Sequence, residues 1–499
     1  MNKKVIVIGA GMGGLSSAIR LQNKGYDVEI YEKNDQPGGK MYQLEVEGHT
    51  FDVGPTIVLM PSSYNEVYIE CGKDPADYIS MIPLNPIYDV YFSSDYRKYS
   101  VSPDLSKLVE MTEKKGRKTA EGFFKYLSDI YERYRVAEAH FITRPFRYKR
   151  DFYNPFMLYQ AYKLKTFNSA KAMMSSYIED KDLQEMLSFQ TLYIGVSPNK
   201  GPSLYNIIPM IELIYGVWGL KGGMQAMAKG MEKLFNELGG KIFYNSEVDE
   251  IIIKDGKAVG IKVGDREIMS DIVISNADFP YTMKNLVKDE GARGKYTPEK
   301  IDSMEYSCSC LVFYWAVDKD YKDLAEHTFI VSRDFDKNLE QLFEGDLIED
   351  PSVYLSIPSN IDSGMAPEGK SSFYMLIPVP ELGVAKYEYN EENIDYYRKK
   401  AIEHLKNIPG LENIENEIYY EKYFTPHDYE NYFSAYRGAT FGLQPTLLQS
   451  NHFRPQSKSL NCEGLYFTGS STHPGAGVPI ALEGGRICAS EVMKDTYNE

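Results

Sequence analysis

The sequence contains few residues of the kinds that cross-link chains or bind metals. Its 499 residues include five cysteines, an odd number at positions that match no zinc-binding spacing. Cys308 and Cys310 are two positions apart, so both thiols would lie on one face of a strand. We expect all five to be reduced core residues of a cytosolic protein. We expect neither a bound metal nor a nucleophile elbow.

Positive charge and long apolar runs are also scarce. The formal net charge of −16 argues against nucleic-acid binding, because phosphate contacts need a basic surface. The best candidate for a membrane span, residues 207–220, is interrupted by Pro209, Glu212 and Gly216. The apolar run after Lys4 is too short for a signal peptide. These features predict a cytoplasmic protein with no nucleic-acid partner.

Tryptophan is rare, but the other aromatic residues are abundant. The chain has two Trp, 41 Tyr and 23 Phe, and it is long enough for two or three domains. Two explanations remain open from the sequence. The aromatic side chains form a large core, or they line an apolar cavity or an interfacial surface.

The first forty residues carry a nucleotide-binding pattern. A β-branched run at 5–8 predicts a buried parallel strand, and the sequence GAGMGG follows at 9–14. An amphipathic helix to about residue 25 and a second strand at 28–31, followed by Glu32, complete the unit. The glycines permit a tight turn, a close pyrophosphate and helix–strand packing, while Glu32 can accept hydrogen bonds from a ribose. The pattern predicts a Rossmann-type dinucleotide site at a helix N-terminus.

Further glycine-rich stretches extend this site. The sequences GGK at 38–40 and DVGPT at 52–56 follow Glu32 closely, and this segment resembles two-dinucleotide-binding flavoproteins. Near the other end of the chain, a strand leads into Gly469, and STHPGAGVP at 471–479 precedes a helix expected at 480–494. That helix N-terminus would offer hydrogen-bond donors and positive potential to a flavin ring. Two such turns predict the two ends of one extended FAD.

The candidate cofactor-binding residues come from several parts of the chain. In flavoproteins of this type, the residue at Val248 presents its backbone to the adenine, and the end of the strand at 271–278 approaches the FAD. The complete set is Gly9, Gly11, Met12, Gly13, Gly14, Glu32, Lys33, Gly38, Gly39, Lys40, Gly54, Pro55, Thr56, Val248, Asn276, Gly469, Gly475, Gly477, Val478 and Pro479.

Only one catalytic candidate adjoins these residues. His473 lies beside the expected flavin site. A structural role is favoured for it, because the sequence orients no partner for its ring. The catalytic residues are therefore unknown from the sequence, and the redox step is assigned to FAD.

The middle of the chain combines a helical and a β-rich region. Residues 104–195 are mainly helical, and 141–165 interleaves aromatic residues with Arg144, Arg147, Lys149 and Arg150. This composition fits a surface that lies on an anionic membrane, or a solvated helical face with a packed aromatic side. Strands at 309–317, 353–357 and 372–378 predict a separate sheet.

Together these features predict an α/β fold. We expect a Rossmann-like FAD-binding domain of the amine-oxidase type, formed by residues 1–75, 205–285 and 425–499. An α+β substrate domain would be inserted into it, with a helical, membrane-facing part at 76–204 and a sheet at 286–424.

Five motifs together resemble the phytoene-desaturase branch of these flavoproteins, and more narrowly the bacterial diapophytoene (dehydrosqualene) desaturases. They are the opening fingerprint through Lys40, FDVGPTIV at 51–58, FQTLYIG at 189–195, GPSLY at 201–205 and THPGAGVP at 472–479. The resemblance covers nearly all of the chain and implies non-covalent FAD, with an apolar tunnel for a long linear isoprenoid. It also implies peripheral association with the inner face of the cell membrane. Two departures are Lys40, where arginine is frequent, and Glu483-Gly-Gly485 after the last motif.

The resemblance also implies a reaction on a thirty-carbon hydrocarbon. Hydride would pass from one carbon to the flavin, and the neighbouring carbon would lose a proton, so that each cycle adds a conjugated double bond. Oxygen or a quinone would then accept the electrons, and the sequence does not distinguish them. A carotenoid end-group oxidase and a non-catalytic isoprenoid carrier on the same fold remain as alternatives. The motif at 472–479 argues against an amine oxidase.

Overall fold

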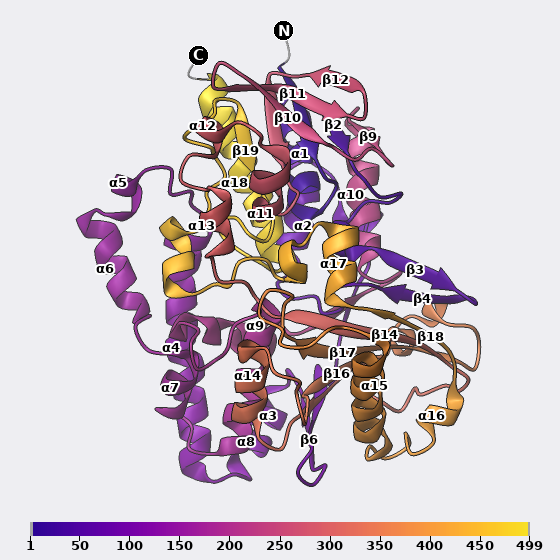
Figure 1. Cartoon of the computed structure of the whole chain (residues 1–499). Helices are drawn as coiled ribbons and strands as arrows, with labels where there is room; N and C mark the ends of the chain where they lie inside the picture. Colours follow the sequence, from indigo (N-terminus) through magenta and orange to yellow (C-terminus); the bar gives the residue numbers. More distant parts are fainter. Residues whose placement is uncertain (1–2, 498–499) are drawn as a thin grey trace.

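The computed structural model describes residues 3–497. One end of the molecule is built on a five-stranded parallel sheet in the order β19-β13-β1-β2-β9 (Figure 1). Its strands are β1 (Lys4–Ile8), β2 (Asp27–Tyr31), β9 (Lys241–Phe243), β13 (Ile272–Ser275) and β19 (Leu465–Phe467). The beginning, the middle and the end of the chain therefore meet in one sheet.

The β-branched first strand is buried on both sides. Val5 and Val7 face a helical layer, whereas Ile6 and Ile8 pack against a small antiparallel sheet. The helices are α1 (Met12–Asn23), α2 (Pro61–Ile69), α10 (Gln225–Glu237) and α18 (Val478–Tyr497), and the small sheet contains β10 (Glu250–Lys254), β11 (Lys257–Val263) and β12 (Arg266–Met269). Covering layers on both faces explain why this strand is a continuous apolar run.

Helices α1 and α18 lie side by side in this layer, although they come from opposite ends of the chain (Figure 1). Ser16 Oγ donates a hydrogen bond to the Leu482 carbonyl oxygen at 2.5 Å. A Cβ added to Gly485 would lie 2.5 Å from both the Gly13 carbonyl oxygen and Ser16 Cβ. The Glu483-Gly-Gly485 sequence thus has a structural explanation, because Gly485 permits close contact between the two helices.

The other end of the molecule contains a seven-stranded sheet in the order β18-β14-β17-β16-β15-β6-β7. Its strands are β6 (Tyr88–Phe92), β7 (Lys98–Val101), β14 (Ser309–Val317), β15 (His327–Val331), β16 (Val353–Ser356), β17 (Ser371–Val379) and β18 (Ile418–Phe424). Two of these, β6 and β7, come from residues 76–204, so the part of the substrate domain that was grouped as helical also contributes strands to this sheet. Every residue of β14 is buried, so both faces of the sheet are covered at this strand.

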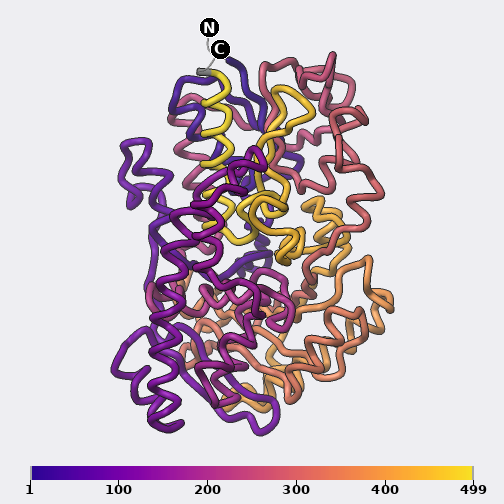
Figure 2. Tube along the Cα trace, turned by 90° about the vertical axis from the view of Figure 1, so that its left-hand side faces the viewer, coloured from indigo at the N-terminus to yellow at the C-terminus, as the bar shows by residue number. Residues whose placement is uncertain are grey.

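A bundle of helices flanks both sheets on one side of the molecule. This side faces the viewer in Figure 2, where most of the bundle is purple. Its members are α3 (Leu105–Glu113), α4 (Arg117–Ala137), α5 (Lys149–Phe152), α6 (Pro155–Leu164), α7 (Ala170–Ser175), α8 (Lys181–Ser188) and α9 (Ile207–Tyr215). Within residues 3–497, no helix is both long enough and apolar enough to cross a membrane.

One cation of this bundle differs from expectation. Arg147, which the sequence placed with the membrane-facing cations, donates to Glu491 Oε2 at 2.6 Å and to Asp495 Oδ1 at 2.8 Å. It therefore fastens the segment before α5 to α18. Arg144, Lys149 and Arg150 are exposed.

Short elements complete the described chain. The hairpin β3 (Gln43–Val46)/β4 (His49–Asp52) and the antiparallel pair β5 (Met81–Pro83)/β8 (Trp218–Leu220) form two further two-stranded sheets. The remaining helices are α11 (Phe279–Tyr281), α12 (Glu290–Arg293), α13 (Pro298–Asp302), α14 (Phe335–Glu344), α15 (Glu391–Lys406), α16 (Ile414–Glu417) and α17 (Pro426–Phe433).

The α1–α18 contact gives a prediction with an internal control. Gly485→Ala should lower the free energy of unfolding by about 1–3 kcal/mol, because the methyl group meets backbone and Cβ atoms of α1. Gly484→Ala places its Cβ at ordinary contact distance, 3.5 Å from Pro474 Cδ and Thr468 Oγ1. This control should be as stable as the wild type or gain up to about 1 kcal/mol from helix propensity. Urea unfolding of the three proteins measures both effects, and equal losses would contradict the close-contact explanation.

Candidate active site

One cavity of about 520 Å³ brings together residues that are far apart in the sequence. Its wall includes every candidate cofactor-binding residue except Gly14. Gly14 lies behind the turn, where a Cβ would come within 2.2 Å of the Gly9 carbonyl oxygen. Its place fits the expected role in helix–strand packing. Contact of the others with a cofactor stays a prediction.

The first glycine turn forms a shallow cradle at the start of α1. Gly9 has a φ of 90° and Gly11 is the N-cap of α1. A Cβ on Gly11 would lie 2.6 Å from Asn276 Nδ2, and one on Gly13 would lie 2.7 Å from Thr468 Oγ1. Gly11, Met12 and Gly13 line the cavity. The first backbone N–H groups of a helix have no partner within the helix, which suits a pyrophosphate.

Glu32 is held rigidly at the end of β2. Its carboxylate accepts hydrogen bonds from the backbone N–H of Ala10 at 2.7 Å and of Asn34 at 2.9 Å. Burial raises the pKa of Glu32, and these donors oppose the rise. The fixed oxygens beside the glycine turn fit the expected acceptor for a ribose. By contrast, the neighbouring Lys33 ammonium donates to the Asn431 carbonyl oxygen and Ser434 Oγ.

Lys40 and Asp278 place opposite charges at the cavity wall. Lys40 Nζ donates to the Thr440 carbonyl oxygen at 2.6 Å. Burial lowers the pKa of Lys40, while the Asp278 carboxylate favours its charged form. Asp278 was not among the candidates from the sequence. It accepts hydrogen bonds from Ser471 Oγ and from the Tyr436 backbone N–H, and its place just beyond β13 was the available signal, because ligands bind at the carboxyl ends of parallel strands.

A buried arginine shapes the second glycine turn. Arg454 is 2% exposed, and its guanidinium donates to the carbonyl oxygens of Leu443, Gln449, Ser470 and Thr472 at 2.6–3.1 Å. Burial lowers the pKa of Arg454 to about 10, so it stays charged at neutral pH. This arginine could not be predicted from the sequence, since its partners are backbone atoms that carry no sequence signature.

The glycines of that turn face the same cavity as the first turn. Gly475 and Gly477 have φ values of 144° and 108°. A Cβ on either would have its nearest described neighbour 3.8–4.0 Å away, so these positions border open space. The two turns and the charged pair between them form an elongated polar half that fits a dinucleotide.

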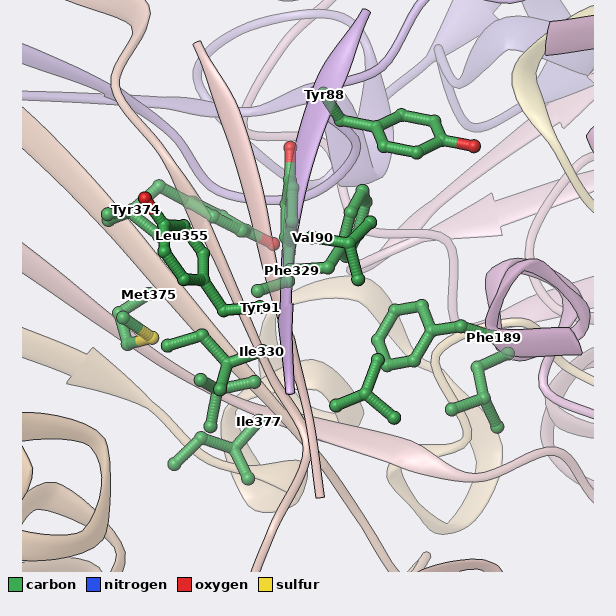
Figure 3. Packing of buried hydrophobic residues seen from close by; sticks show 14 of the residues in the cluster. Tyr88, Val90, Tyr91, Phe189, Phe329, Ile330, Leu355, Tyr374, Met375 and Ile377 are labelled. Atoms are coloured by element: carbon green, nitrogen blue, oxygen red, sulfur yellow. The ribbon is translucent and has the colours of Figure 1, made fainter. Parts of the chain in front are cut away.

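The other half of the cavity is apolar and aromatic. Its wall is formed by Phe189, Leu192, Tyr193, Ile207, Ile208, Ile211, Phe329, Tyr354, Tyr374 and Leu376. Phe189 and Phe329 have ring centroids 5.0 Å apart, and Phe329 stacks on Tyr354 at 4.8 Å. Figure 3 shows Phe189, Phe329 and Tyr374 converging from different elements. Cys308 and Cys310 also line the cavity, so their shared face is a wall of the site.

Glu212 and His473 do not line the cavity. Glu212 is fully buried, and burial raises its pKa to about 8, so it is protonated at neutral pH. His473 is 1% exposed, and its Nε2 donates to the Arg144 carbonyl oxygen at 2.8 Å. His473 thus supports the neighbouring backbone. Within residues 3–497, no group of three or more His, Cys, Asp or Glu residues could hold a metal ion.

Known proteins resemble the chain along nearly its full length. It is 43% identical over 495 residues to a 4,4′-diapophytoene desaturase (4,4′-diaponeurosporene-forming) of Staphylococcus haemolyticus, covering 98% of this chain and 99% of the relative. It is 44% identical over 497 residues to the enzyme of the same name from Staphylococcus aureus strain Newman, covering 99% of each. A solved oxidoreductase from Methanosarcina mazei shares the fold, with a TM-score of 0.65, 18% identity and coverage of 98% and 100%.

The family is equally clear from the sequence match. The family described as flavin containing amine oxidoreductase matches residues 12–493. The match begins within the first glycine turn and includes the second turn and the aromatic wall of the cavity. The polar half fits the expected FAD through its backbone cradles, its fixed carboxylate and its buried ammonium. The predicted α/β flavoprotein fold and the predicted cofactor are therefore confirmed, and the chain belongs to the flavin-containing amine oxidoreductase family, with FAD as its cofactor.

Proposed function

We propose that this protein is an FAD-dependent desaturase that introduces conjugated double bonds into a linear thirty-carbon isoprenoid. Diapophytoene would be converted to a diaponeurosporene-type product. The observation that carries this proposal is the 43–44% identity, over nearly the whole chain, to enzymes of that name. The apolar half of the cavity supports it, because a hydrocarbon has no polar groups to pair.

Residues in the polar half of the cavity bind the cofactor, and residues in the apolar half bind the substrate. The first glycine turn and the N-terminus of α1 bind the pyrophosphate, and Glu32 orients the ribose. The late glycine turn before α18 lies at the flavin ring. When bound, FAD supplies the two-electron chemistry by accepting a hydride. The aromatic wall around Phe329 holds the hydrocarbon and excludes water, which would otherwise trap a cationic carbon. Oxygen or a quinone stays our prediction for the electron acceptor.

Co-expression tests the reaction and its chain length together. Cells that make diapophytoene should become coloured when they also express this protein, and cells that make the forty-carbon phytoene should colour less. Pigment extraction and absorption spectra measure both products. Colourless cells with both substrates would refute the desaturase. Oxygenated products from an already desaturated substrate would favour the end-group oxidase, and protein without bound flavin would favour the carrier.

Glu32 gives a direct test of the cofactor site. Glu32→Gln removes the charge of the ribose acceptor, and we expect FAD to bind about 10- to 100-fold more weakly, the loss of one charged hydrogen bond. Glu29→Gln is the matched control on the same strand, because Glu29 pairs with Lys4 and does not line the cavity. Fluorescence titration of FAD into the apoprotein measures both. Equal affinity for all three proteins would contradict the role of Glu32.

We also propose that the exposed aromatic and basic surface of the helical bundle rests on an anionic bilayer, the inner face of the cell membrane. Helix α6 buries Met157, Gln160 and Leu164, yet its outer side exposes further large apolar residues. With their neighbours, these are Tyr153, Phe156, Leu158, Tyr159, Tyr162 and Phe167.

Two features support this surface as the place of substrate entry. Arg144, Lys149 and Arg150 are exposed beside the aromatic residues and suit lipid phosphates. Leu447 and Leu448 are exposed as well, and they lie close in sequence to Ser450 and Asn451, which line the cavity. A hydrocarbon dissolved in the bilayer would reach the cavity without crossing water.

Charge removal tests the membrane proposal. Each surface cation contributes about 1 kcal/mol to binding of anionic lipid. Changing Arg144, Lys149 and Arg150 together to Gln should therefore lower partitioning into phosphatidylglycerol vesicles by about 100-fold at low salt. The control changes the exposed Lys319, Lys322 and Lys399 to Gln and preserves net charge relative to the first variant. Vesicle sedimentation measures partitioning, and a similar loss in both variants would show that only net charge matters.

A further inference from the structure

A chain of hydrogen bonds leads from the aromatic wall into the protein interior. Thr56 and Tyr354 both line the cavity. Thr56 Oγ1 and Tyr354 Oη are 2.5 Å apart, and Tyr354 Oη lies 2.8 Å from His327 Nδ1. The three groups therefore form a continuous path from the cavity surface to a buried imidazole.

The end of this path is sealed from solvent. His327 is 0% exposed on β15 and pairs with Ser356 of the neighbouring strand. Its Nε2 has no hydrogen-bond partner among the described residues. Glu326 Oε1 lies 3.9 Å from His327 Nδ1 and accepts a hydrogen bond from Ser356 Oγ. A buried polar nitrogen without a partner costs stability, so a function would explain its presence.

Both titratable groups are held neutral. Burial lowers the pKa of His327 to about 3 and raises the pKa of Glu326 to about 8. A neutral imidazole has one unprotonated ring nitrogen. With the Tyr354 hydroxyl donating to it, that nitrogen is Nδ1, which can take up a proton. The nearby Glu326 carboxyl oxygen is in a position to stabilise the positive charge that a proton would bring.

We propose that Tyr354 takes up the proton that the hydrocarbon loses during desaturation and that His327, buried behind the cavity wall, is the final acceptor of the relayed proton. This inference rests on the proposed desaturase function. One carbon has lost a hydride in the two-electron oxidation. The neighbouring C–H bond then breaks, and its electron pair becomes the second bond of the new double bond. The proton passes to Tyr354 Oη as the proton of Tyr354 moves to His327 Nδ1, leaving an imidazolium.

The apolar surroundings make such a path necessary. A carbon-bound proton next to a cationic centre is strongly acidic, but an aromatic cavity offers it no water. The Tyr354 hydroxyl provides an oxygen on the wall itself, and the imidazole behind it removes the proton from the hydrocarbon. Thr56 holds the hydroxyl from the other side and acts as a positioning residue.

Tyr354→Phe removes the oxygen and keeps the ring that stacks on Phe329. We expect turnover to fall by about 100-fold or more, as for loss of a general base, with unchanged FAD affinity. Proton loss should become rate-limiting, so that a primary isotope effect appears with substrate deuterated at the proton-losing carbon. Tyr126→Phe is the control, because it removes a buried hydroxyl that bonds Asn206 Oδ1. A slower variant without that isotope effect would overturn the proposal.

His327→Gln distinguishes a role of His327 as proton acceptor from a role that only maintains the structure. The Gln amide oxygen can still accept a hydrogen bond from Tyr354, but it cannot take up a proton. We expect the same loss of turnover and the same isotope effect as in Tyr354→Phe, with the melting temperature and FAD content of the wild type. Turnover at the wild-type rate would overturn the role of His327.

Nitrogen NMR tests the path without substrate or turnover. In apoprotein labelled with ¹⁵N-histidine, the His327 signals should be those of a neutral imidazole from pH 5 to 9. The Nδ1 signal should shift in Tyr354→Phe as its hydrogen bond is lost. An imidazolium at neutral pH would overturn the proposal, since a filled acceptor takes no proton. These spectra judge the path even if co-expression shows that the substrate is not a linear isoprenoid.

Discussion

The contact between α1 and α18 is the constraint on which the site depends. Gly485 brings α18 against the Gly13 carbonyl oxygen and Ser16 of α1, and Ser16 also bonds Leu482. Because the two helices are fixed at their N-terminal turns, the glycine turns that precede them open into the same cavity. Asn276, at the end of a third chain segment, fills the space beside Gly11 and Gly13. An extended cofactor site thus follows from close packing of backbone at three places.

The resulting cavity has two halves of different polarity. Its polar half offers fixed hydrogen-bond donors, a carboxylate and an ammonium. These groups replace the hydrogen bonds to water that a charged dinucleotide gives up on binding, so its desolvation costs little free energy. Its other half offers aromatic carbon around Phe189 and Phe329, where a hydrocarbon is favoured and ions are not. The buried guanidinium of Arg454 fixes the backbone of the second glycine turn, because it donates a hydrogen bond to the Ser470 carbonyl oxygen. Preorganisation of this kind leaves the reacting groups dry and oriented.

Local signals were sufficient to predict the parts of the site that depend on backbone chemistry. The GAGMGG turn, Glu32 and the late glycine turn all lie where their patterns indicated, because each pattern describes its own conformation. The missing residues have the opposite character. Asp278 and Arg147 bind partners distant in sequence, and Arg454 binds backbone carbonyl oxygens, which carry no sequence signature. Composition therefore grouped Arg147 with the exposed cations, although it is paired with α18. The pairing of β6 with β15 could not be predicted for the same reason, since pairing between distant segments carries no local signature.

The aromatic abundance of the chain has a consequence that composition alone could not reveal. Tyrosine supplies the same apolar area as phenylalanine, but each buried hydroxyl must find a partner. On the cavity wall, those partners turn a hydrophobic surface into one with a few oriented polar atoms. Tyr354 is such a residue: its ring contributes to the aromatic stack, and its hydroxyl is held between Thr56 and His327. A reaction that creates charge in a hydrocarbon needs both properties in one side chain, because only a wall that is dry can protect the cation and only an oriented oxygen can remove its proton.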